Sequence, residues 1–352
     1  MVTRLASAGH SITVEPGAGT GSGHDDESYR KAGARVEPLS GGDVLVTVEP
    51  PAIEAINKVR AVLGFLEPLD RPDAVQELAG SGSTFFAFEL LPRTTRAQAM
   101  DALSSQATIT GYEATLEAAR SCDRIFPMLT TAAGTIRPAS VLVLGTGVAG
   151  LQAVATARRL GAMVAAFDVR AAAAEQAESL GARFLTVDME PQDASTTGGY
   201  AREMPADTEG RVLSALFDEV VAADAVITTA AVPGRPAPRL VSAEMVEGMR
   251  PGSAIVDGAA STGGNCDLTR PGATVVERGV TVAGPLDLPS RSANHASQLY
   301  SRNVVAFLEL LADNEGAIDG SVDDEIIEGT VVARGGSIVH PRLVEPAESS
   351  RA

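Results

Sequence analysis

A glycine-rich turn directly after an apolar run constrains the fold of this chain most strongly. Residues 140–150 read SVLVLGTGVAG, a β-branched run followed by Gly145, Gly147 and Gly150 in G-x-G-x-x-G spacing. Glycines at these positions allow a tight turn, let the backbone approach a pyrophosphate, and let helix and strand pack closely. The surrounding residues 138–157 carry no charge and approach the length of a membrane span. Their glycines instead favour a buried strand, a turn and the start of a helix.

An acidic residue follows where a dinucleotide-binding motif requires one. The next apolar run ends at Asp168, 23 residues after Gly145, where a carboxylate hydrogen-bonds the adenosine ribose hydroxyls. This acid disfavours a 2′-phosphate and therefore favours NAD(H), while Arg170 nearby is a phosphate-binding type that keeps NADP(H) open. We also expect the segments 228–238 and 257–265 to flank the nicotinamide half of the cofactor, the alternative being ordinary connecting turns.

Short apolar runs alternate with helical patterns along the chain, which is typical of α/β proteins with doubly wound, mostly parallel sheets. A long helix is expected from Ala97 to about Arg120 and another over 294–311, with a hairpin in the tail. Strands are expected at 11–15, 43–48, 83–90, 140–145, 163–168, 183–188, 225–230, 254–259 and 280–284. We predict two Rossmann-like domains with the cofactor in the cleft between them. Residues 130–290 form the NAD(H)-binding domain, and residues 1–129 with 291–352 form a discontinuous second domain.

Composition excludes several classes of function. The net charge of −17 repels a phosphate backbone, and no basic stripe is visible, so nucleic acid is not an expected partner. Cys122 and Cys266 lie far apart without a pairing pattern, which indicates a reduced, cytoplasmic compartment. The amino terminus lacks the apolar region of a signal peptide. The four histidines have no second ligand at metal-binding spacing, so no metal site is expected.

Several motifs together resemble one family. VLVLGTGVAGLQAVATARRLGA, AFDVR, TTAAVPGRPAP, VDGAASTGGNC and PRTTRAQAMDALSSQ are similar to the NAD-binding α subunit of proton-translocating NAD(P) transhydrogenases, whose sister family is alanine dehydrogenase. The resemblance covers nearly the whole chain. It implies that this subunit binds NAD(H), that a partner subunit holds NADP(H), and that hydride passes directly between the two nicotinamides, coupled to proton movement through membrane subunits. It also implies a homodimer.

The resemblance assigns roles to individual residues. Arg93, Gln98 and Asp101 match an Arg-Gln-Asp loop that contacts the nicotinamide end of the cofactor. Hydride transfer between nicotinamides requires mainly proximity, orientation and exclusion of water, so a site without a catalytic histidine is consistent. A mobile loop that closes over the site resembles residues 195–204, which include Met204. The further cofactor-binding positions are Thr94, Ser104, Gly145, Gly147, Val148, Gly150, Asp168, Val169, Arg170, Gly199, Tyr200, Ala231 and Pro233.

The chain also departs from the family pattern. The family's amino-terminal strand and the arginine-bearing turn after it are expected to be missing, and residues 284–291 differ from the aromatic- or histidine-containing loop usual there. After residue 343 no apolar span follows, whereas fused transhydrogenases carry membrane helices at this point. We therefore expect the separate soluble subunit of a three-subunit enzyme, peripheral at the inner face of the cytoplasmic membrane through its partners.

Two alternatives remain open from the sequence. One is a non-catalytic NAD-binding paralogue, which the missing strand motivates because it would leave a sheet edge bare. The other is an alanine dehydrogenase, which needs a cation for the substrate carboxylate and a general acid or base. The sister family's lysine, histidine and aspartate align with Glu49, Glu67 and Ser261. These replacements remove the dehydrogenase mechanism and place that alternative behind the paralogue.

Overall fold

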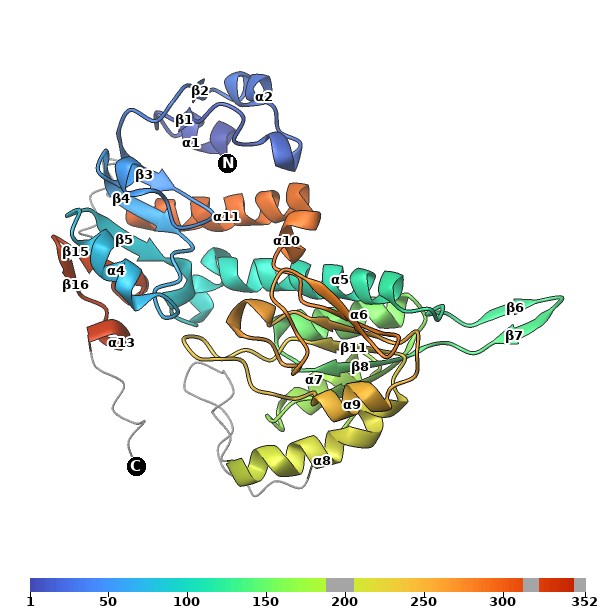
Figure 1. Cartoon of the computed structure of the whole chain (residues 1–352). Coiled ribbons are helices and arrows are strands. Elements are labelled where there is room, and N and C mark those ends of the chain that lie inside the picture. The colour runs from blue at the N-terminus through green and yellow to red at the C-terminus, as the bar shows by residue number, and fades with distance from the viewer. Residues whose placement is uncertain (188–205, 313–322, 345–352) are drawn as a thin grey trace. The chain divides into compact units, whose positions relative to one another are not determined.

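The computed structural model describes residues 1–187, 206–312 and 323–344 (Figure 1). The chain divides into two compact units. The first unit comprises Met1–Gln106 and Ala293–Ala352, and the second comprises Ala107–Ser292. Each unit has its own sheets and its own apolar clusters.

The described part of the second unit contains a seven-stranded sheet. Its strands are β8 (Ser140–Leu144), β9 (Met163–Phe167), β10 (Arg183–Phe184), β11 (Ala225–Thr228), β12 (Ala254–Asp257), β13 (Thr274–Glu277) and β14 (Val280–Ala283). They lie in the order β10-β9-β8-β11-β12-β14-β13, and each neighbouring pair is parallel except β13 with β14. The strand order reverses between β8 and β11, which is where open parallel sheets bind their ligands.

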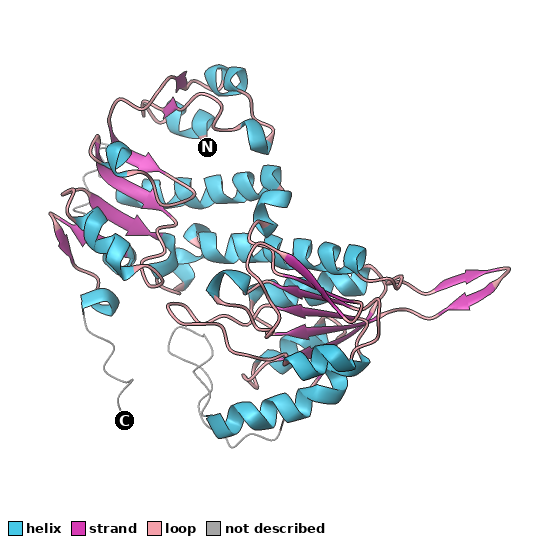
Figure 2. Ribbon diagram, viewed as in Figure 1, coloured by secondary structure: helices cyan, strands magenta, loops and turns pink. Residues whose placement is uncertain are grey.

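Helices cover both faces of this sheet (Figure 2). Successive residues of β8 alternate between two buried clusters: Val141 and Val143 belong to one, Leu142 and Leu144 to the other. Strands buried on both faces are continuous apolar runs, as the sequence shows. One face is covered by α5 (Ala102–Ser121), α6 (Val148–Arg159) and α7 (Ala173–Ser179), and the other by α8 (Ala206–Ala222) and α9 (Ala243–Gly248).

A close contact joins α5 to the beginning of α6. A side chain at Gly111 of α5 would overlap the carbonyl oxygen of Ala149, which lies in the first turn of α6. Only glycine, which has no Cβ, permits this approach. The position of the first turn of α6 therefore depends on the absence of a side chain at residue 111.

The uncharged stretch 138–157 forms β8, a turn and most of α6, as the sequence predicts. Within the described residues, no helix is both long enough and apolar enough to span a membrane. The predicted fold class is confirmed, since the chain is a mixed α/β protein with mostly parallel sheets.

A β-hairpin projects from the rest of the second unit (Figure 1). It consists of β6 (Leu129–Thr131) and β7 (Gly134–Ile136), which pair with each other in an antiparallel two-stranded sheet. Every residue of both strands is exposed, so neither strand has the alternation of a half-buried strand. The sequence did not predict this hairpin.

The described part of the first unit contains two sheets. A five-stranded sheet has the order β16-β15-β5-β4-β3, in which β3, β4 and β5 are parallel and β15 is antiparallel to β5. Its strands are β3 (Gly42–Val46), β4 (Val59–Gly64), β5 (Thr84–Ala87), β15 (Val331–Arg334) and β16 (Ser337–Ile338). A separate parallel pair is formed by β1 (Thr13–Val14) and β2 (Arg35–Val36).

Alternation on β4 and β5 again builds two clusters, with Leu63 and Phe86 in one and Val62 and Phe85 in the other. Helix α11 (Ala293–Leu311) packs on the first cluster and α4 (Pro72–Ala79) on the second. The shorter helices of this unit are α1 (Val2–Ser7), α2 (Asp26–Lys31), α3 (Ile53–Ile56), α12 (Glu325–Thr330), α13 (Pro341–Val344), η1 (Thr20–Ser22), η2 (Phe88–Leu90) and η3 (Thr95–Met100). In the second unit, α10 (Leu288–Arg291) and η4 (Ala260–Thr262) complete the set for the described residues.

Two local predictions differ from the structure. The helix expected to begin at Ala97 is split into the 3-10 helix η3 and the α-helix α5, which begins at Ala102. The break is at Asp101, whose ψ of 81° is not helical and whose carboxylate accepts a hydrogen bond from the Ser104 N–H at 2.8 Å. Aspartate caps a helix start in this way and so ends the preceding turn. The sequence also missed β4.

Candidate functional site

The glycine motif lies at the switch point of the second unit's sheet, and each of its glycines has a different environment. Gly145 has a φ of 88°, and an added Cβ would lie 2.8 Å from the Ala230 nitrogen. A Cβ at Gly150 would overlap the Gly145 carbonyl oxygen, which shows how closely helix and strand pack. A Cβ at Gly147 would meet no described atom within 4 Å. The turn therefore needs glycine at two positions for the fold and leaves open space at the third.

Helix α6 begins directly after this turn. Gly147 is its N-cap residue, and no side chain among the described residues caps it. The first N–H groups of a helix without a cap are free to bind an anion, which the helix dipole also favours. Val148, at the same turn, is 41% exposed although it is aliphatic. These features fit a cofactor pyrophosphate and its neighbouring ribose.

Asp168 follows β9 and is engaged by protein groups. Its carboxylate accepts hydrogen bonds from the Thr146 N–H at 2.8 Å, the Thr146 hydroxyl at 3.1 Å, and the Arg170 N–H at 2.9 Å. The Arg170 guanidinium donates two more, at 2.9 and 2.8 Å. Burial raises the pKa of the Asp168 carboxyl, but the Arg170 hydrogen bonds outweigh burial, so this pKa lies below its ordinary value. A carboxylate offers about four lone-pair positions, so a ribose hydroxyl must displace a present donor.

Two loops follow the carboxyl ends of β11 and β12. Residues 229–238 contain the predicted contacts Ala231 and Pro233, and residues 258–265 contain the glycines of the second segment. The Thr229 hydroxyl donates to the Gly145 carbonyl at 2.9 Å, which connects the first loop to the glycine turn. Those predicted contacts of the second unit that the structure describes therefore lie in the turn, beside Asp168, or in this loop.

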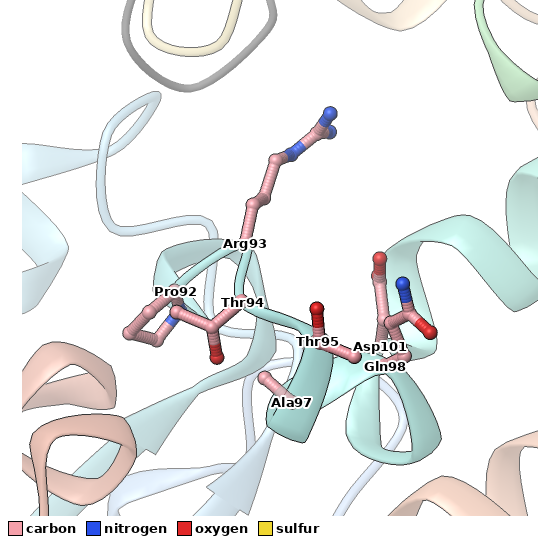
Figure 3. A pocket seen from close by; sticks show the side chains of 7 residues that line it. All are labelled: Pro92, Arg93, Thr94, Thr95, Ala97, Gln98 and Asp101. Atoms are coloured by element: carbon pink, nitrogen blue, oxygen red, sulfur yellow. The ribbon is translucent and has the colours of Figure 1, made fainter.

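The first unit contains a polar pocket of about 210 Å³ (Figure 3). Gln98 and Asp101 lie side by side in it, and the Arg93 side chain extends away from the loop. The structure thus brings together in one pocket the three residues predicted to orient a nicotinamide. The lining residues are Pro92, Arg93, Thr94, Thr95, Ala97, Gln98 and Asp101.

The pocket loop is held by contacts within its own unit. The Asn303 side chain on α11 donates to the Ala99 carbonyl at 2.9 Å and accepts from the Ser105 hydroxyl at 2.8 Å. Arg96 forms a salt bridge with Asp324, the N-cap residue of α12. These contacts fix the backbone of the loop from both sides of residue 98 and leave the Gln98 side chain exposed.

Asp101 and Ser104 bond to each other in this structure. The Asp101 carboxylate accepts from both the Ser104 N–H and the Ser104 hydroxyl, at 2.8 and 2.6 Å. Asp101 is therefore both a pocket residue and the cap of α5. A ligand that bonds this carboxylate shares it with the first turn of the helix.

Some predicted residues fall where the structure gives no description. Gly199, Tyr200 and Met204 lie outside the described residues, as does the whole loop 195–204 that contains them. The altered loop 284–291 is described, and its Arg291 pairs with Glu117 of α5 at 2.6 Å.

Three buried polar residues were not found by sequence reasoning. Asp257 and Asn265 are fully buried beside the two loops. Glu89 in the first unit accepts from the N–H groups of Leu66 and Glu67 at 2.9 and 2.7 Å. Its Oε2 is buried with no hydrogen-bond partner among the described residues. Burial raises the pKa of Glu89 from 4.5 to about 7.

Comparisons with known proteins match the whole arrangement. The Alanine dehydrogenase/PNT family matches with its N-terminal domain at residues 1–110 and its C-terminal domain at residues 114–341. An NAD(P) transhydrogenase subunit alpha from Rhodospirillum rubrum is 44% identical, over 97% of this chain and 93% of that one. A transhydrogenase crystal structure from Sinorhizobium meliloti is 42% identical with a TM-score of 0.83, covering 97% of this chain and 93% of that one.

An L-alanine dehydrogenase structure is less similar. It is 26% identical with a TM-score of 0.78, and covers 97% of this chain and 92% of that one. The fold is therefore shared by both branches of the family, while identity is higher to the transhydrogenase branch. The chain belongs to the alanine dehydrogenase/transhydrogenase family of nucleotide-binding oxidoreductases and is a homologue of the NAD(P) transhydrogenase α subunit.

Proposed function

We propose that this chain is the NAD(H)-binding subunit of a proton-translocating transhydrogenase and passes hydride directly from NADH to NADP⁺ on a partner subunit. The observation that carries the proposal is the combination of an open glycine turn at Gly147 with a polar pocket at Arg93, Gln98 and Asp101 in a homologue of the transhydrogenase α subunit. The bound cofactor supplies the hydride, and the protein supplies binding and orientation.

The residues fit the dinucleotide as follows. The N–H groups at the start of α6 bind the pyrophosphate, because the space at Gly147 is open and the helix start has no side-chain cap among the described residues. Asp168 accepts the adenosine ribose hydroxyls once the Arg170 guanidinium moves aside, since Arg170 now fills its acceptor positions. Val148, Val169, Ala231 and Pro233 provide apolar and backbone contacts beside it.

The pocket residues orient the nicotinamide. Gln98 is exposed and offers both a donor and an acceptor for the carboxamide of the ring. Arg93 extends from the loop and provides a positive charge, and Asp101 provides an acceptor. Such positioning groups accelerate transfer by holding donor and acceptor in a reactive geometry, without proton transfer at the ring.

An alanine dehydrogenase activity is disfavoured by charge. The positions that align with the sister family's lysine and histidine are Glu49 and Glu67, and a carboxylate repels the carboxylate of an amino acid. Purified protein with NAD⁺ and alanine is therefore expected to form no NADH, and turnover would contradict the assignment.

We propose two kinds of partner. The NADP(H)-binding and membrane-spanning subunits complete the enzyme and hold this chain at the inner face of the cytoplasmic membrane. A second copy of this chain covers the projecting hairpin and the residue before it, where Ile136 is 51% and Met128 63% exposed. Exposed aliphatic groups gathered on one projection are typical of an interface. Sedimentation is expected to give a dimer, and Ile136→Asp a monomer.

Reconstituted hydride transfer tests the function. The chain is mixed with a transhydrogenase NADP(H)-binding domain, and reduction of an NADP⁺ analogue by NADH is followed by absorbance. Gln98→Ala is expected to bind NADH nearly as tightly as wild type while transfer falls by about 10²-fold, because the oriented geometry is lost. Gln76→Ala on the exposed face of α4 is the matched control.

The outcomes separate the candidate functions. Tight NADH binding without any transfer by the wild-type chain would favour the non-catalytic paralogue. Unchanged transfer by Gln98→Ala would remove the pocket from the proposed site.

A further inference from the structure

A single buried carboxamide joins the two loops at the carboxyl ends of β11 and β12. Asn265 is fully buried, and its Nδ2 donates to the carbonyls of Ala230 at 2.8 Å and Pro238 at 2.7 Å. Its Oδ1 accepts from the Ala230 N–H at 3.1 Å. Both donors and the acceptor of the side chain are therefore committed to the backbone of the neighbouring loop.

Asp257 holds Asn265 in place. Its Oδ2 accepts from the Asn265 N–H at 2.7 Å, the Cys266 N–H at 3.1 Å, and the Thr269 hydroxyl at 2.6 Å. Its Oδ1 accepts from the Thr228 hydroxyl at 2.8 Å, at the end of β11. The carboxylate thus organises the loop that carries Asn265 and ties it to the neighbouring strand.

Ala230 in turn lies against the glycine turn. Its nitrogen would be 2.8 Å from a Cβ at Gly145, and the preceding Thr229 hydroxyl donates to the Gly145 carbonyl. A shift of Ala230 toward Gly145 is blocked by this contact, and a shift away from it breaks the bonds to Asn265. The backbone leading to Ala231 is therefore fixed from two sides.

We propose that Asn265 is a positioning residue for the cofactor. It holds residues 230–233 at the distance from the glycine turn that the nicotinamide half requires, while the adenosine diphosphate half is held by the turn itself and Asp168. The inference rests on the proposed function, because it requires that NADH binds at this edge of the sheet.

The proposal predicts an effect that differs between two ligands. Asn265→Ala removes all three side-chain bonds and releases residues 230–233. Since each unpaired buried group costs on the order of a tenfold change, NADH should bind at least about tenfold more weakly. ADP, which lacks the nicotinamide half, should lose less than about threefold. A general loosening of the domain would weaken both ligands alike.

The experiment is calorimetric titration of the full chain with NADH and with ADP. Thr269→Val is the matched control, because it removes one donor to Asp257 and leaves the Asn265 carboxamide bonded. It should lower the melting temperature without changing the ratio of the two dissociation constants. That ratio should rise in Asn265→Ala alone of these two variants.

A second variant covers the case in which Asn265→Ala does not fold. Arg239 is exposed, and its guanidinium donates to the Gly263, Gly264 and Cys266 carbonyls at 3.3, 3.2 and 2.9 Å, bridging the same two loops. Arg239→Gln should shift the ratio in the same direction by a smaller factor.

The results distinguish the two levels of the argument. A wild-type chain that binds no NADH refutes both the proposed function and this inference. Wild-type binding, with NADH and ADP weakened equally in the folded variant, refutes the inference alone.

Discussion

Glu89 makes the stability of this protein depend on pH in a way that can be calculated. Its carboxylate is buried in the first unit, and two N–H groups bond one oxygen while the other has no partner among the described residues. Burial is the largest effect and raises the pKa from 4.5 to about 7, and the neighbouring Glu67 adds to the rise. The folded chain therefore holds this proton more tightly than the unfolded chain.

The sign and size follow from linkage. The stabilisation by the proton is fully present below the unfolded pKa of 4.5 and is lost as the pH rises through about 7. Between about pH 5.5 and pH 8.5, the Glu89 contribution to the unfolding free energy falls by about 2 kcal/mol. Glu89→Gln removes the titration and keeps an oxygen that accepts the Leu66 and Glu67 N–H bonds.

Urea unfolding at the two pH values measures the effect. The variant's unfolding free energy, relative to wild type, should rise by about 2 kcal/mol from the lower to the higher pH. Glu77→Gln on the exposed side of α4 removes the same kind of charge without burial and is the control. If the wild-type and Glu89→Gln stabilities stay parallel over this range, Glu89 is not a buried titrating group in solution and the reasoning is wrong.

Two further predictions concern the cofactor edge of the second unit. Gly147→Ala should melt like wild type yet weaken NADH binding by about tenfold, whereas Gly150→Ala should lose stability, because only the second Cβ overlaps protein atoms; calorimetry with thermal melts separates them, and a stable Gly150→Ala would contradict the packing argument. Arg170→Met should bind NADH at least as tightly as wild type near pH 8 and progressively less tightly toward pH 6. Without the guanidinium, burial raises the pKa of Asp168, and a protonated carboxyl is a poorer acceptor. A pH profile identical to wild type would show that Arg170 does not control Asp168.

The parts of the fold that the sequence predicts are those with a local signal. The glycine turn after β8 was recognisable because glycine spacing and a continuous apolar run both reflect burial on two faces of one sheet. The pocket residues Arg93, Gln98 and Asp101 were recognisable only through the family resemblance, since their letters alone also describe a helix cap. For Asp101 the structure contains that cap as well.

The missed features depend on partners distant in the sequence. Asn265 bonds to Ala230 and Pro238, and no local pattern distinguishes it from an ordinary loop asparagine. Glu89 ends an apolar run, and its burial follows from how β5 leads into η2 beneath the turn at Leu66. The hairpin β6–β7 has no buried face and thus no periodicity to read.

The contact between Gly111 and Ala149 extends the cofactor site into a helix that contains none of its motif. Because α6 starts at the glycine turn, any side chain at residue 111 displaces the N–H groups proposed to bind the pyrophosphate. A mutational scan scored by NADH affinity would therefore mark Gly111 with the same intolerance as the motif glycines, while a scan limited to residues that touch the ligand would pass over it. For inherited variation or protein engineering, the boundary of this site is set by which backbone atoms must stay in place.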